Sequence, residues 1–597
     1  MAENKPILFT WKIAGEAGFG VNTTALLFSK IITRSGLYAF EYSEYPSLIR
    51  GGHQTSQVSI SDVPVFGIYK NVSLLICLNR DSLRLHVDEL AKNSAVIVDS
   101  AQYTLSQAET FLGNKIKETV LFEVPLTELA IKHAGLNIMR NMVAVGASLY
   151  MHGLATDIAI DLIAEVYPKA RDENIAAIRA GYDYMVEHYG ALASTFEYKV
   201  KMLQLERRGY LLTGNEALGL GAIKGGVSFY AGYPMTPSST LMAFIAEHQY
   251  EYQILVRHAE DEISVLNMAI GASYAGARAL VATSGGGMAL MSEAVGLAAI
   301  TEVPIVVVNV QRPGPATGLP TWTDQGDLRF VLHAGQGEFL RLIIAPGDLE
   351  ECYRTMSEAL NFAEKYQIPV ILLSDKYLAE SHATIEKMPD LEPVERGKAI
   401  LSTQQMIEVN ERNGILPFGR YVPTNDGVSW RTIPGVEHGV YLANSDEHDH
   451  HGYSEEDGDA RLEQVDKRAM KLHPLLAELP RPKVYGNTNS SVLLVAWGSL
   501  KGPILEAMKQ LELHYDTNVA FVHLVYVWPF PIEEMRRLFE QYRRVILIEN
   551  NSMAQLGGLI AQMTEVHIHE KWLKYDGRPF FAEELFSKLE DVLHNRK

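Results

Sequence analysis

The stretch Gly232-Tyr-Pro-Met-Thr-Pro-Ser-Ser239 follows the apolar run Val227–Tyr230, which we predict to be a buried strand. Proline is favoured in the first turn of a helix, so Pro237 indicates a tight turn that leads from the strand into a helix. This order places the Thr236 hydroxyl at the carboxyl end of a strand, where open α/β sheets bind ligands. A capped helix start would by itself explain Pro237 and the serines, but not the rest of the stretch.

Strands and helices alternate after this stretch. Further apolar strands are predicted at Ala279–Thr283, Ile305–Val310 and Val370–Leu373. Helices are predicted after Pro237, from Ala259 and from Gly285. Such alternation predicts a parallel, doubly wound sheet.

Two more α/β units flank this one, so the fold class we predict is α/β with three α/β domains. The first has a strand at Pro6–Ala14 and a helix at Asn22–Ser35, and the last has a strand at Val492–Ala496. Residues 391 to about 485 lack periodicity, which predicts a long connection that crosses the surface or covers a site. The predicted ranges are 1–195, 205–390, 391–485 for the connection and 486–597.

Glu262 lies in the segment Arg257-His-Ala-Glu-Asp-Glu262, which opens a helix. At about 100° per residue it shares a stripe with Leu266, Ala269 and Ile270. A carboxylate on a buried stripe is costly unless it has a partner. An acid favoured by the helix dipole is the alternative, which suits Glu260 and Asp261 better.

Two further turns follow predicted strands. One is the turn Thr283-Ser-Gly-Gly-Gly287, which contains Ser284 and Gly285. Its glycines indicate that the backbone approaches a ligand or a neighbouring segment closely. Gln311-Arg-Pro-Gly-Pro-Ala-Thr-Gly-Leu-Pro-Thr321 places Arg312, a forked and permanent cation, at a strand end where it suits a carboxylate. A surface arginine in a Pro/Gly loop is the alternative.

The glycines Gly15, Gly18 and Gly20 follow the first strand and open a helix, so their amides can hold a phosphate. Their order is not the G-x-G-x-x-G of a dinucleotide fold, and a plain tight turn explains them equally well. Arg50, beside two glycines, is a second possible anion site or an ordinary loop residue.

Bulk composition excludes several classes of protein. The net charge of −19 over 597 residues argues against nucleic acid. Cys77 and Cys352 form no Cys-x-x-Cys, which argues against a disulfide framework or a cluster bound by this chain alone and fits a cytoplasmic protein. The start shows no signal-peptide pattern, and no apolar run approaches a membrane span. His448, His450 and His451 lack standard metal-ligand spacing, so we predict a solvated loop there and no metal.

Together these segments resemble the α subunit of 2-oxoacid:ferredoxin oxidoreductases with a γ domain fused at the N-terminus. The resemblance covers nearly the whole chain, and Tyr233-Pro-Met-Thr-Pro-Ser-Ser239 differs from the family's Y-P-I-T-P-S-S only at Met235. Glu260-Asp-Glu-Ile263, the Ser284 turn and the Arg312 segment look like the next signatures. Trp497-Gly-Ser and Trp528-Pro-Phe-Pro look like its transketolase-type C-terminal domain.

The resemblance implies a role for each candidate residue. Glu262 would be catalytic and hydrogen-bond N1′ of the thiamine diphosphate aminopyrimidine ring, in a pyrimidine-binding domain. Thr236 and Arg312 would bind the substrate. The cofactor-binding positions would be Tyr233, Pro234, Glu262, Ser284 and Gly285. The positions that would face coenzyme A or another domain are Gly15, Gly18, Gly20 and Arg50.

Other expected motifs are missing. A complete thiamine enzyme carries G-D-G and N-N to hold Mg²⁺ and diphosphate; here Asn550-Asn551 has no G-D-G upstream. The resemblance therefore implies a partner β subunit that supplies the diphosphate and Mg²⁺ site and a [4Fe-4S] cluster, passes electrons to ferredoxin and forms an (αβ)2 assembly. Alone, the chain should be inactive.

The implied reaction is the CoA-dependent oxidative decarboxylation of 2-oxoglutarate to succinyl-CoA, or its reverse. Arg420 and Arg431 are candidates to meet a distal carboxylate, although surface arginines are common. Pyruvate and branched-chain 2-oxo acids remain alternatives. A non-catalytic scaffold subunit is another alternative. The presence of Glu262, Thr236 and Arg312 argues against it, because a scaffold needs none of these residues. A stand-alone transketolase-like enzyme and an NAD-dependent dehydrogenase are disfavoured by the missing G-D-G and by the glycine order.

Overall fold

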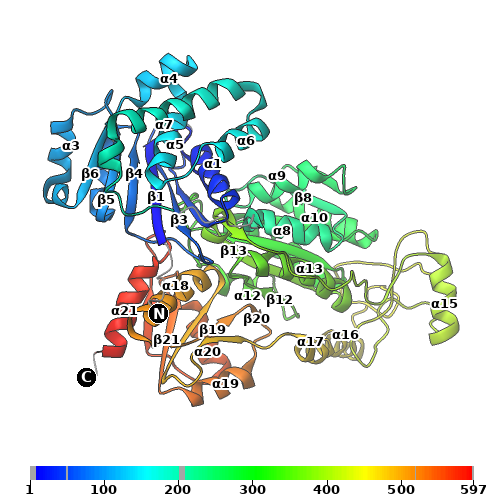
Figure 1. The fold of residues 1–597 in the computed structure, drawn as a ribbon. Helices are drawn as coiled ribbons and strands as arrows, with labels where there is room; N and C mark the ends of the chain where they lie inside the picture. Colours follow the sequence, from blue (N-terminus) through cyan, green and yellow to red (C-terminus); the bar gives the residue numbers. More distant parts are fainter. Residues whose placement is uncertain (1–7, 49–50, 201–208, 518, 595–597) are drawn as a thin grey trace.

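A computed structural model describes residues 8–48, 51–200, 209–517 and 519–594. It contains sheets of eight, seven and five strands and a two-stranded pair. Figure 1 shows the N-terminal unit above the central unit, the C-terminal unit below, and a long arm to one side. The predicted α/β class with three α/β units is confirmed.

The N-terminal sheet has the order β6-β5-β4-β1-β3-β2-β14-β7. Helices α1 and α4 to α7 cover one face, and α2 and α3 cover β4 and β5 on the other. Its strands are β1 (Leu8–Glu16), β2 (Tyr38–Glu44), β3 (His53–Ser61), β4 (Val72–Cys77), β5 (Leu90–Asp99), β6 (Thr119–Val124), β7 (Tyr210–Thr213) and β14 (His382–Ile385). Its helices are α1 (Val21–Arg34), α2 (Arg80–His86), α3 (Leu105–Leu112), α4 (Leu126–Ala134), α5 (Arg140–His152), α6 (Asp157–Val166) and α7 (Arg171–Ala193).

The central sheet has the order β20-β12-β13-β11-β10-β8-β9, and only β20 runs antiparallel to its neighbour. Helices α8, α9 and α13 cover one face, while α10, α11, α12 and the C-terminal unit cover the other. Its strands are β8 (Phe229–Gly232), β9 (Leu255–His258), β10 (Ala279–Thr283), β11 (Ile305–Gln311), β12 (Leu342–Ile344), β13 (Pro369–Asp375) and β20 (Tyr526–Trp528). Its helices are α8 (Gly214–Lys224), α9 (Ser239–His248), α10 (Glu262–Tyr274), α11 (Gly285–Ile300), α12 (Leu328–His333), α13 (Leu349–Tyr366) and α14 (Lys376–Glu380).

The C-terminal sheet has the order β17-β19-β18-β21-β22. One face packs against α18 and α21, and the other joins the core of the central unit. Its elements are β17 (Lys483–Gly486), β18 (Val492–Trp497), β19 (Ala520–Leu524), β21 (Arg544–Glu549), β22 (Glu570–Leu573), α18 (Lys501–Tyr515), α19 (Ile532–Gln541), α20 (Gln555–Thr564) and α21 (Ala582–His594). Short 3₁₀ turns lie at Val87–Glu89, Gly113–Lys117, Asn137–Met139, Pro168–Ala170 and Gly498–Leu500.

The three units exchange strands. Strands β7 and β14 come from beyond residue 205 but complete the N-terminal sheet, and β20 leaves the C-terminal unit to pair with β12. The first 190 residues therefore do not form the whole sheet. Their edge strand β2 has unpaired backbone groups, and β14 from the central part of the chain pairs with them. We keep the ranges 1–195, 205–390, 391–485 and 486–597 as a proposal for the domain division.

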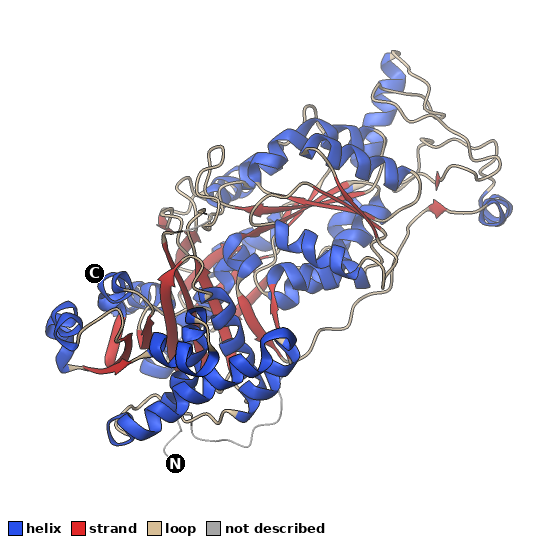
Figure 2. Ribbon diagram, turned by 90° about the horizontal axis from the view of Figure 1, so that it is seen from above, coloured by secondary structure: helices blue, strands red, loops and turns tan. Residues whose placement is uncertain are grey.

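The connection predicted for 391–485 is more ordered than its sequence indicates. It contains β15 (Ala399–Ile400), α15 (Thr403–Asn413), β16 (Arg431–Thr432), α16 (Gly458–Met470) and α17 (Leu472–Glu478). We call residues 399–478 the arm; Figure 2 shows it projecting from the rest of the molecule. It has its own small apolar core around Tyr421 and Tyr441.

The histidines of the arm are part of this folded segment. His448 is 1% exposed and its ring lies 4.0 Å from that of Tyr421. His450 contacts Glu463 and His451 contacts a backbone carbonyl. The predicted solvated loop is therefore wrong for His448, because aromatic packing buries it.

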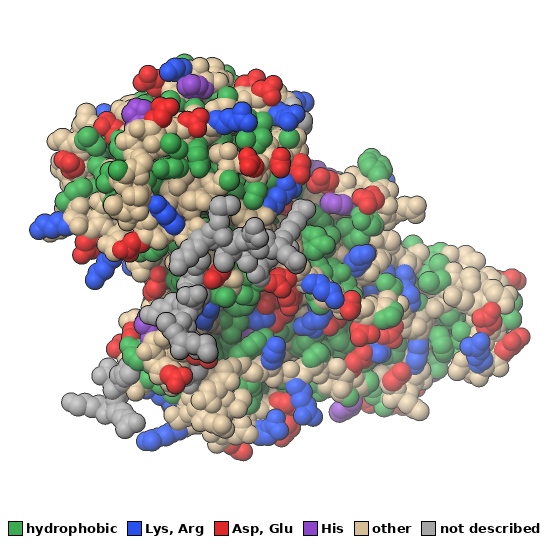
Figure 3. Space-filling view, in the orientation of Figure 1, with side chains coloured by type: hydrophobic (Ala, Val, Ile, Leu, Met, Phe, Trp, Pro, Cys, Tyr) green, Lys and Arg blue, Asp and Glu red, His purple; other side chains and the backbone are tan. Residues whose placement is uncertain are grey.

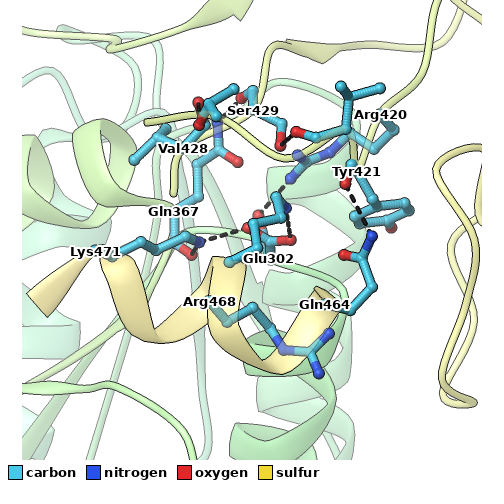
Figure 4. A network of polar contacts seen from close by, with 12 residues as sticks. Glu302, Gln367, Arg420, Tyr421, Val428, Ser429, Gln464, Arg468 and Lys471 are labelled. Carbon is cyan, nitrogen blue, oxygen red and sulfur yellow. Dashed lines mark hydrogen bonds and ion pairs between the residues drawn. The ribbon is translucent and has the colours of Figure 1, made fainter. Parts of the chain in front are cut away.

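A buried charge cluster attaches the arm to the central unit (Figure 4). Glu302, fully buried just after α11, contacts Lys467 and lies 2.5 Å from the Lys471 amine. Arg420 donates to the Glu302 carbonyl over 2.9 Å. Burial by itself would raise the pKa of Glu302, but the charges of Lys467 and Lys471 hold it below its usual range.

Arg420 and Arg431 are therefore not surface residues. Arg431 is 1% exposed and donates to the Glu364 carboxylate over 2.5 Å. The expectation that either meets a distal substrate carboxylate is wrong for this chain, because both guanidinium groups are buried and bound to groups of the central unit.

The molecular surface agrees with the acidic composition. On the face drawn in Figure 3, acidic and basic side chains are interspersed and form no basic stripe. Within the described ranges, no helix has the length and apolarity needed to cross a membrane.

Replacing Glu302 with alanine should release the arm. The change leaves Lys467 and Lys471 buried without their counter-charge, which costs roughly 3–5 kcal/mol. We expect a lower Tm and faster protease cleavage within 399–478. Glu463→Ala, which removes an exposed carboxylate of the same arm, is the control and should change neither. Equal behaviour of the two variants would show that the cluster does not anchor the arm.

Candidate functional site

The candidate site lies where the strand order of the central sheet reverses. From β8 the chain forms β9 on one side and then crosses to β10 on the other. Loops that leave β8 and β10 in opposite directions open a crevice at the carboxyl ends of these strands, and ligands of open α/β sheets bind there. The predicted residues Tyr233, Thr236, Ser284 and Gly285 all follow these two strands.

The turn after β8 is not a capped helix start. Ser238 is the N-cap of α9, but its side chain makes no capping bond and instead donates to the Met235 carbonyl over 2.7 Å. Asn215 donates to the Pro237 carbonyl over 2.9 Å, and Arg312 donates to the Thr236 carbonyl over 2.6 Å. Thr236 and Arg312, predicted separately, are therefore brought together. Tyr233 is 38% exposed at the mouth of the crevice.

Glu262 occupies the buried position predicted for it. It is the first residue of α10 and is 3% exposed, while Asp261 is the N-cap and accepts from the Ser264 amide over 2.7 Å. The helix-start role therefore belongs to Asp261. No hydrogen-bond partner for Glu262 Oε1 exists among the described residues. A buried carboxylate oxygen without a partner is costly, which indicates that a ligand donor completes it.

A glycine makes room for this carboxylate. A Cβ at Gly287, in the first turn of α11, would overlap the Thr283 hydroxyl and lie 2.7 Å from Glu262 Oε1. The N-cap residue Ser284 makes no capping bond, and its buried hydroxyl also lacks a partner in the described chain. Unused amides at a helix start, beside an unpartnered hydroxyl and carboxylate, form a polar site for a ligand.

Asp327 was missed by the sequence reasoning. A Cβ at Gly285 would lie 2.6 Å from Asp327 Oδ2, so this carboxylate lies at the start of α11. It accepts from Asn309 Nδ2 over 3.0 Å, and burial raises its pKa against the opposing effects of Asn309 and Arg312. Burial also lowers the pKa of the Arg312 guanidinium, and the charge of Asp327 raises it in part.

Asn309 and Asp324 were also missed. Each has a buried oxygen for which the described residues supply no hydrogen. Burial, reinforced by the charge of Asp327, raises the pKa of Asp324 to about 7. Asn309 gave a signal, since it is a polar residue inside the apolar strand Ile305–Gln311, but the acids lie in a loop whose path the sequence does not define.

The C-terminal unit holds this loop in place. Gln325 donates to the Trp497 carbonyl over 2.9 Å and accepts from the Asn550 amide over 3.0 Å. Asn551 donates to the Gln325 carbonyl over 3.1 Å and to Glu549 over 2.7 Å. The Asn550 contact is made by its backbone N–H, and its side chain donates to the Lys574 carbonyl over 2.9 Å, so both asparagine side chains are committed to internal contacts.

The glycine turn of the N-terminal unit has positive φ angles at Gly18 and Gly20, which favour glycine. Gly20 lies against the Asn141 side chain, and its φ is 75°. The Ala17 amide donates to the Gly52 carbonyl, so this turn adjoins the loop that contains Arg50. Arg50 itself lies outside the described residues. The backbone carbonyl of Tyr45, before that loop, accepts a hydrogen bond from the Thr321 hydroxyl over 2.7 Å. This bond links the loop to the segment that begins at Arg312.

Comparison with known protein families gives three matches along the chain. The family model described as "Pyruvate flavodoxin/ferredoxin oxidoreductase, thiamine diP-bdg" matches residues 220–463. The one described as "Pyruvate ferredoxin/flavodoxin oxidoreductase" matches 10–184, and "Transketolase, C-terminal domain" matches 484–576. The chain thus contains a thiamine-diphosphate-binding domain between two further α/β domains.

Full-length relatives make the assignment specific. The 2-oxoacid:ferredoxin oxidoreductase subunit alpha of a Sulfolobus species is 33% identical over 98% of this chain and 97% of that protein. The 2-oxoglutarate oxidoreductase subunit KorA of Mycobacterium tuberculosis is 28% identical over 98% and 91%. The solved 2-oxoglutarate:ferredoxin oxidoreductase from Magnetococcus marinus, with 2-oxoglutarate, coenzyme A and succinyl-CoA bound, superposes with a TM-score of 0.88 at 27% identity over 99% and 100%. The chain belongs to the family of 2-oxoacid:ferredoxin oxidoreductase α subunits, and it is an oxidoreductase subunit.

Gly287→Ala should disturb the site from within. The added methyl group displaces Glu262 or Thr283, an overpacking that costs about 1–3 kcal/mol. Gly286→Ala is the matched control, because nothing lies within 4 Å of its Cβ position; a helical Gly→Ala change there is neutral or stabilising. Thermal unfolding of both variants tests this, and a Tm for Gly287→Ala as high as that of Gly286→Ala would contradict the packing.

Proposed function

We propose that this chain is the γα-fused subunit of a 2-oxoglutarate:ferredoxin oxidoreductase, which decarboxylates 2-oxoglutarate oxidatively to succinyl-CoA and passes the electrons to ferredoxin through a β subunit. The same site would also serve the reverse carboxylation. The M. marinus enzyme and the KorA relative support the choice of 2-oxoglutarate. Arg420 and Arg431 do not, because their partners are internal.

The observation that carries the proposal is the buried Glu262 carboxylate with an unpartnered oxygen. Such a group fits a ring nitrogen of the thiamine diphosphate aminopyrimidine, which can donate or share a proton with it. The Gly287 position, which has no space for a Cβ, fits this reading because it lets Glu262 lie against the start of α11. Tyr233, Pro234, Ser284 and Gly285 would border the same cofactor from the turns after β8 and β10.

Thiamine diphosphate, when bound, supplies the electron sink that decarboxylation of a 2-oxo acid requires. This chain's residues then bind and orient. Glu262 would hold a proton at the aminopyrimidine, and Arg312 would hold the substrate carboxylate through its guanidinium group. Asp327 would act on Arg312 as a positioning residue, since its charge opposes the desolvation of that guanidinium. The Thr236 hydroxyl, beside the carbonyl that anchors Arg312, would contact a substrate oxygen.

A scaffold role fits this arrangement less well. A scaffold gains nothing from a buried, incompletely bonded carboxylate, which reduces stability. Pyruvate or a branched-chain 2-oxo acid would use the same residues and remains the alternative substrate.

A β subunit would complete the site. Helices α10 and α11 expose Ile263, Met268 and Leu290 beside Glu262, an apolar surface that suits a protein partner. The partner would bring the diphosphate and Mg²⁺ site and the [4Fe-4S] cluster, since the side chains of Asn550 and Asn551 donate to backbone carbonyls of this chain and its cysteines are two buried thiols. We propose an (αβ)2 assembly in the cytoplasm.

Coenzyme A would approach through the N-terminal unit. The turn Gly15–Gly20 and the loop containing Arg50 adjoin each other, and Tyr45 connects that loop to the Arg312 segment. A phosphate at the start of α1 would suit the glycine amides. Gly15, Gly18, Gly20 and Arg50 remain predictions.

Glu262→Ala, purified with its partner, should lose about 10²–10⁴-fold in kcat, since it removes a group that moves a proton in the reaction. Glu260→Ala is the control, because the Glu260 carboxylate lies two residues before Glu262 but is exposed to solvent. This variant should keep full turnover. Both are assayed by CoA-dependent reduction of a viologen dye. Full turnover by Glu262→Ala would refute the catalytic assignment.

The same assay tests substrate and partner. The chain alone and the co-purified complex are compared on 2-oxoglutarate, pyruvate and 2-oxoisovalerate. We expect turnover only from the complex and the highest kcat/KM on 2-oxoglutarate. Preference for another acid would overturn the substrate but keep the chemistry, whereas turnover by the lone chain would overturn the shared site.

A further inference from the structure

A cavity of about 380 Å³ lies where the three units meet. It is bordered by the residues that follow β12 and β18, at the carboxyl ends of these strands. In the central sheet β12 is separated from β11, which carries Arg312 at its end, by β13. The cavity is therefore on the same ligand-binding edge as the reaction site but is separate from it. Its size is that of a small-molecule pocket.

Aromatic side chains form one part of the cavity wall. Tyr38 and Phe40 come from β2, Tyr377 from α14 and Phe66 from the loop before β4. The first three are less than 8% exposed, and the rings of Phe40 and Tyr377 are 5.6 Å apart. Such walls bind an apolar or aromatic body, and the faces of their rings attract a cation.

The two lysines of the cavity already have partners. Lys501 contacts Asp348 and lies 2.5 Å from Glu351 Oε1, so two carboxylates surround its charge. Lys483 lies 4.7 Å over the Tyr485 ring at the exposed rim. The charge of Lys501 is therefore already compensated within the chain.

More carboxylates than ammonium groups line the cavity. Those that line the cavity are Asp348, Glu350 and Glu386. Glu386 accepts from the Tyr38 hydroxyl, but Glu350 makes no hydrogen bond or ion pair with the described residues. Partial burial, followed by the charge of Asp348, raises the pKa of Glu350. A bound cation would lower this pKa again, because it favours the charged carboxylate.

Ser381 provides a further polar contact. It lines the cavity, is 3% exposed, and its hydroxyl lacks a partner among the described residues. Buried hydroxyls are normally hydrogen-bonded, so a ligand donor or acceptor fits here.

We propose that this cavity binds a small organic ammonium ion with an apolar or aromatic body. The body lies against the wall formed by the rings of Tyr38, Phe40 and Tyr377, and the ammonium group donates to the Glu350 carboxylate and the Ser381 hydroxyl. Because residues of all three units line the cavity, a ligand bound there stabilises their mutual arrangement.

The test uses two probes of matched shape, 3-phenylpropylamine and 3-phenylpropionate, titrated by calorimetry into the full chain in complex with its partner. We expect heat of binding and a rise in Tm with the amine only. Binding of the carboxylate with equal or higher affinity, or of neither probe, overturns the proposal.

Two pairs of variants locate the site. Glu350→Gln should weaken amine binding about fivefold, as loss of a partly exposed charge pair does; Glu173→Gln, an exposed acid in the first turn of α7, is its control. Leu505→Trp fills the cavity from α18 and should abolish binding, while Leu513→Trp, 49% exposed on the same helix, should not. Unchanged affinity in both Glu350→Gln and Leu505→Trp would contradict the assigned position.

Discussion

The burial of the Glu262 carboxylate at the start of α10 is the constraint on which the site depends. An acid with 3% exposure and one unpartnered oxygen is unfavourable in the isolated chain. The surroundings accommodate it: Asp261 takes over the capping of the helix, and Gly287 leaves the space that the carboxylate occupies. A site held in this state is preorganised for a ligand that donates a hydrogen bond.

Contacts from all three units hold the candidate site in place. The loop that carries Arg312, Asp324 and Asp327 is held by Asn550 and Asn551 of the C-terminal unit and touched by Tyr45 of the N-terminal unit. Exchanged strands join the same units through the backbone. Because each contact is internal, the geometry of the Arg312 segment depends on the docking of units far away in sequence.

The arm is attached to the body by both buried charge and apolar contact. Its acidic partners Glu302 and Glu364 are buried among cations, and its residues Val428 and Leu475 belong to the apolar core of the central unit. Such pairs contribute little net stability but are strongly destabilising when one partner is lost, so they specify one docked position. The cavity between the units differs, because its apolar walls leave space open for a ligand.

The α/β class, the order of the units and the residues that border the reversal of strand order follow from the amino-acid sequence alone. These are local properties: the period of apolar residues defines β8, β10 and β11, glycine and proline define the turns, and helical spacing places Glu262 inward. The non-local contacts are visible only in the folded chain. Folding buries Arg420 and Arg431, which the sequence leaves as surface candidates, and brings Asp327 to Asn309 and Arg312. It also gives β7 and β14 to the N-terminal sheet. The physical reason is that burial and partner choice depend on packing between segments far apart in sequence, which periodicity does not record.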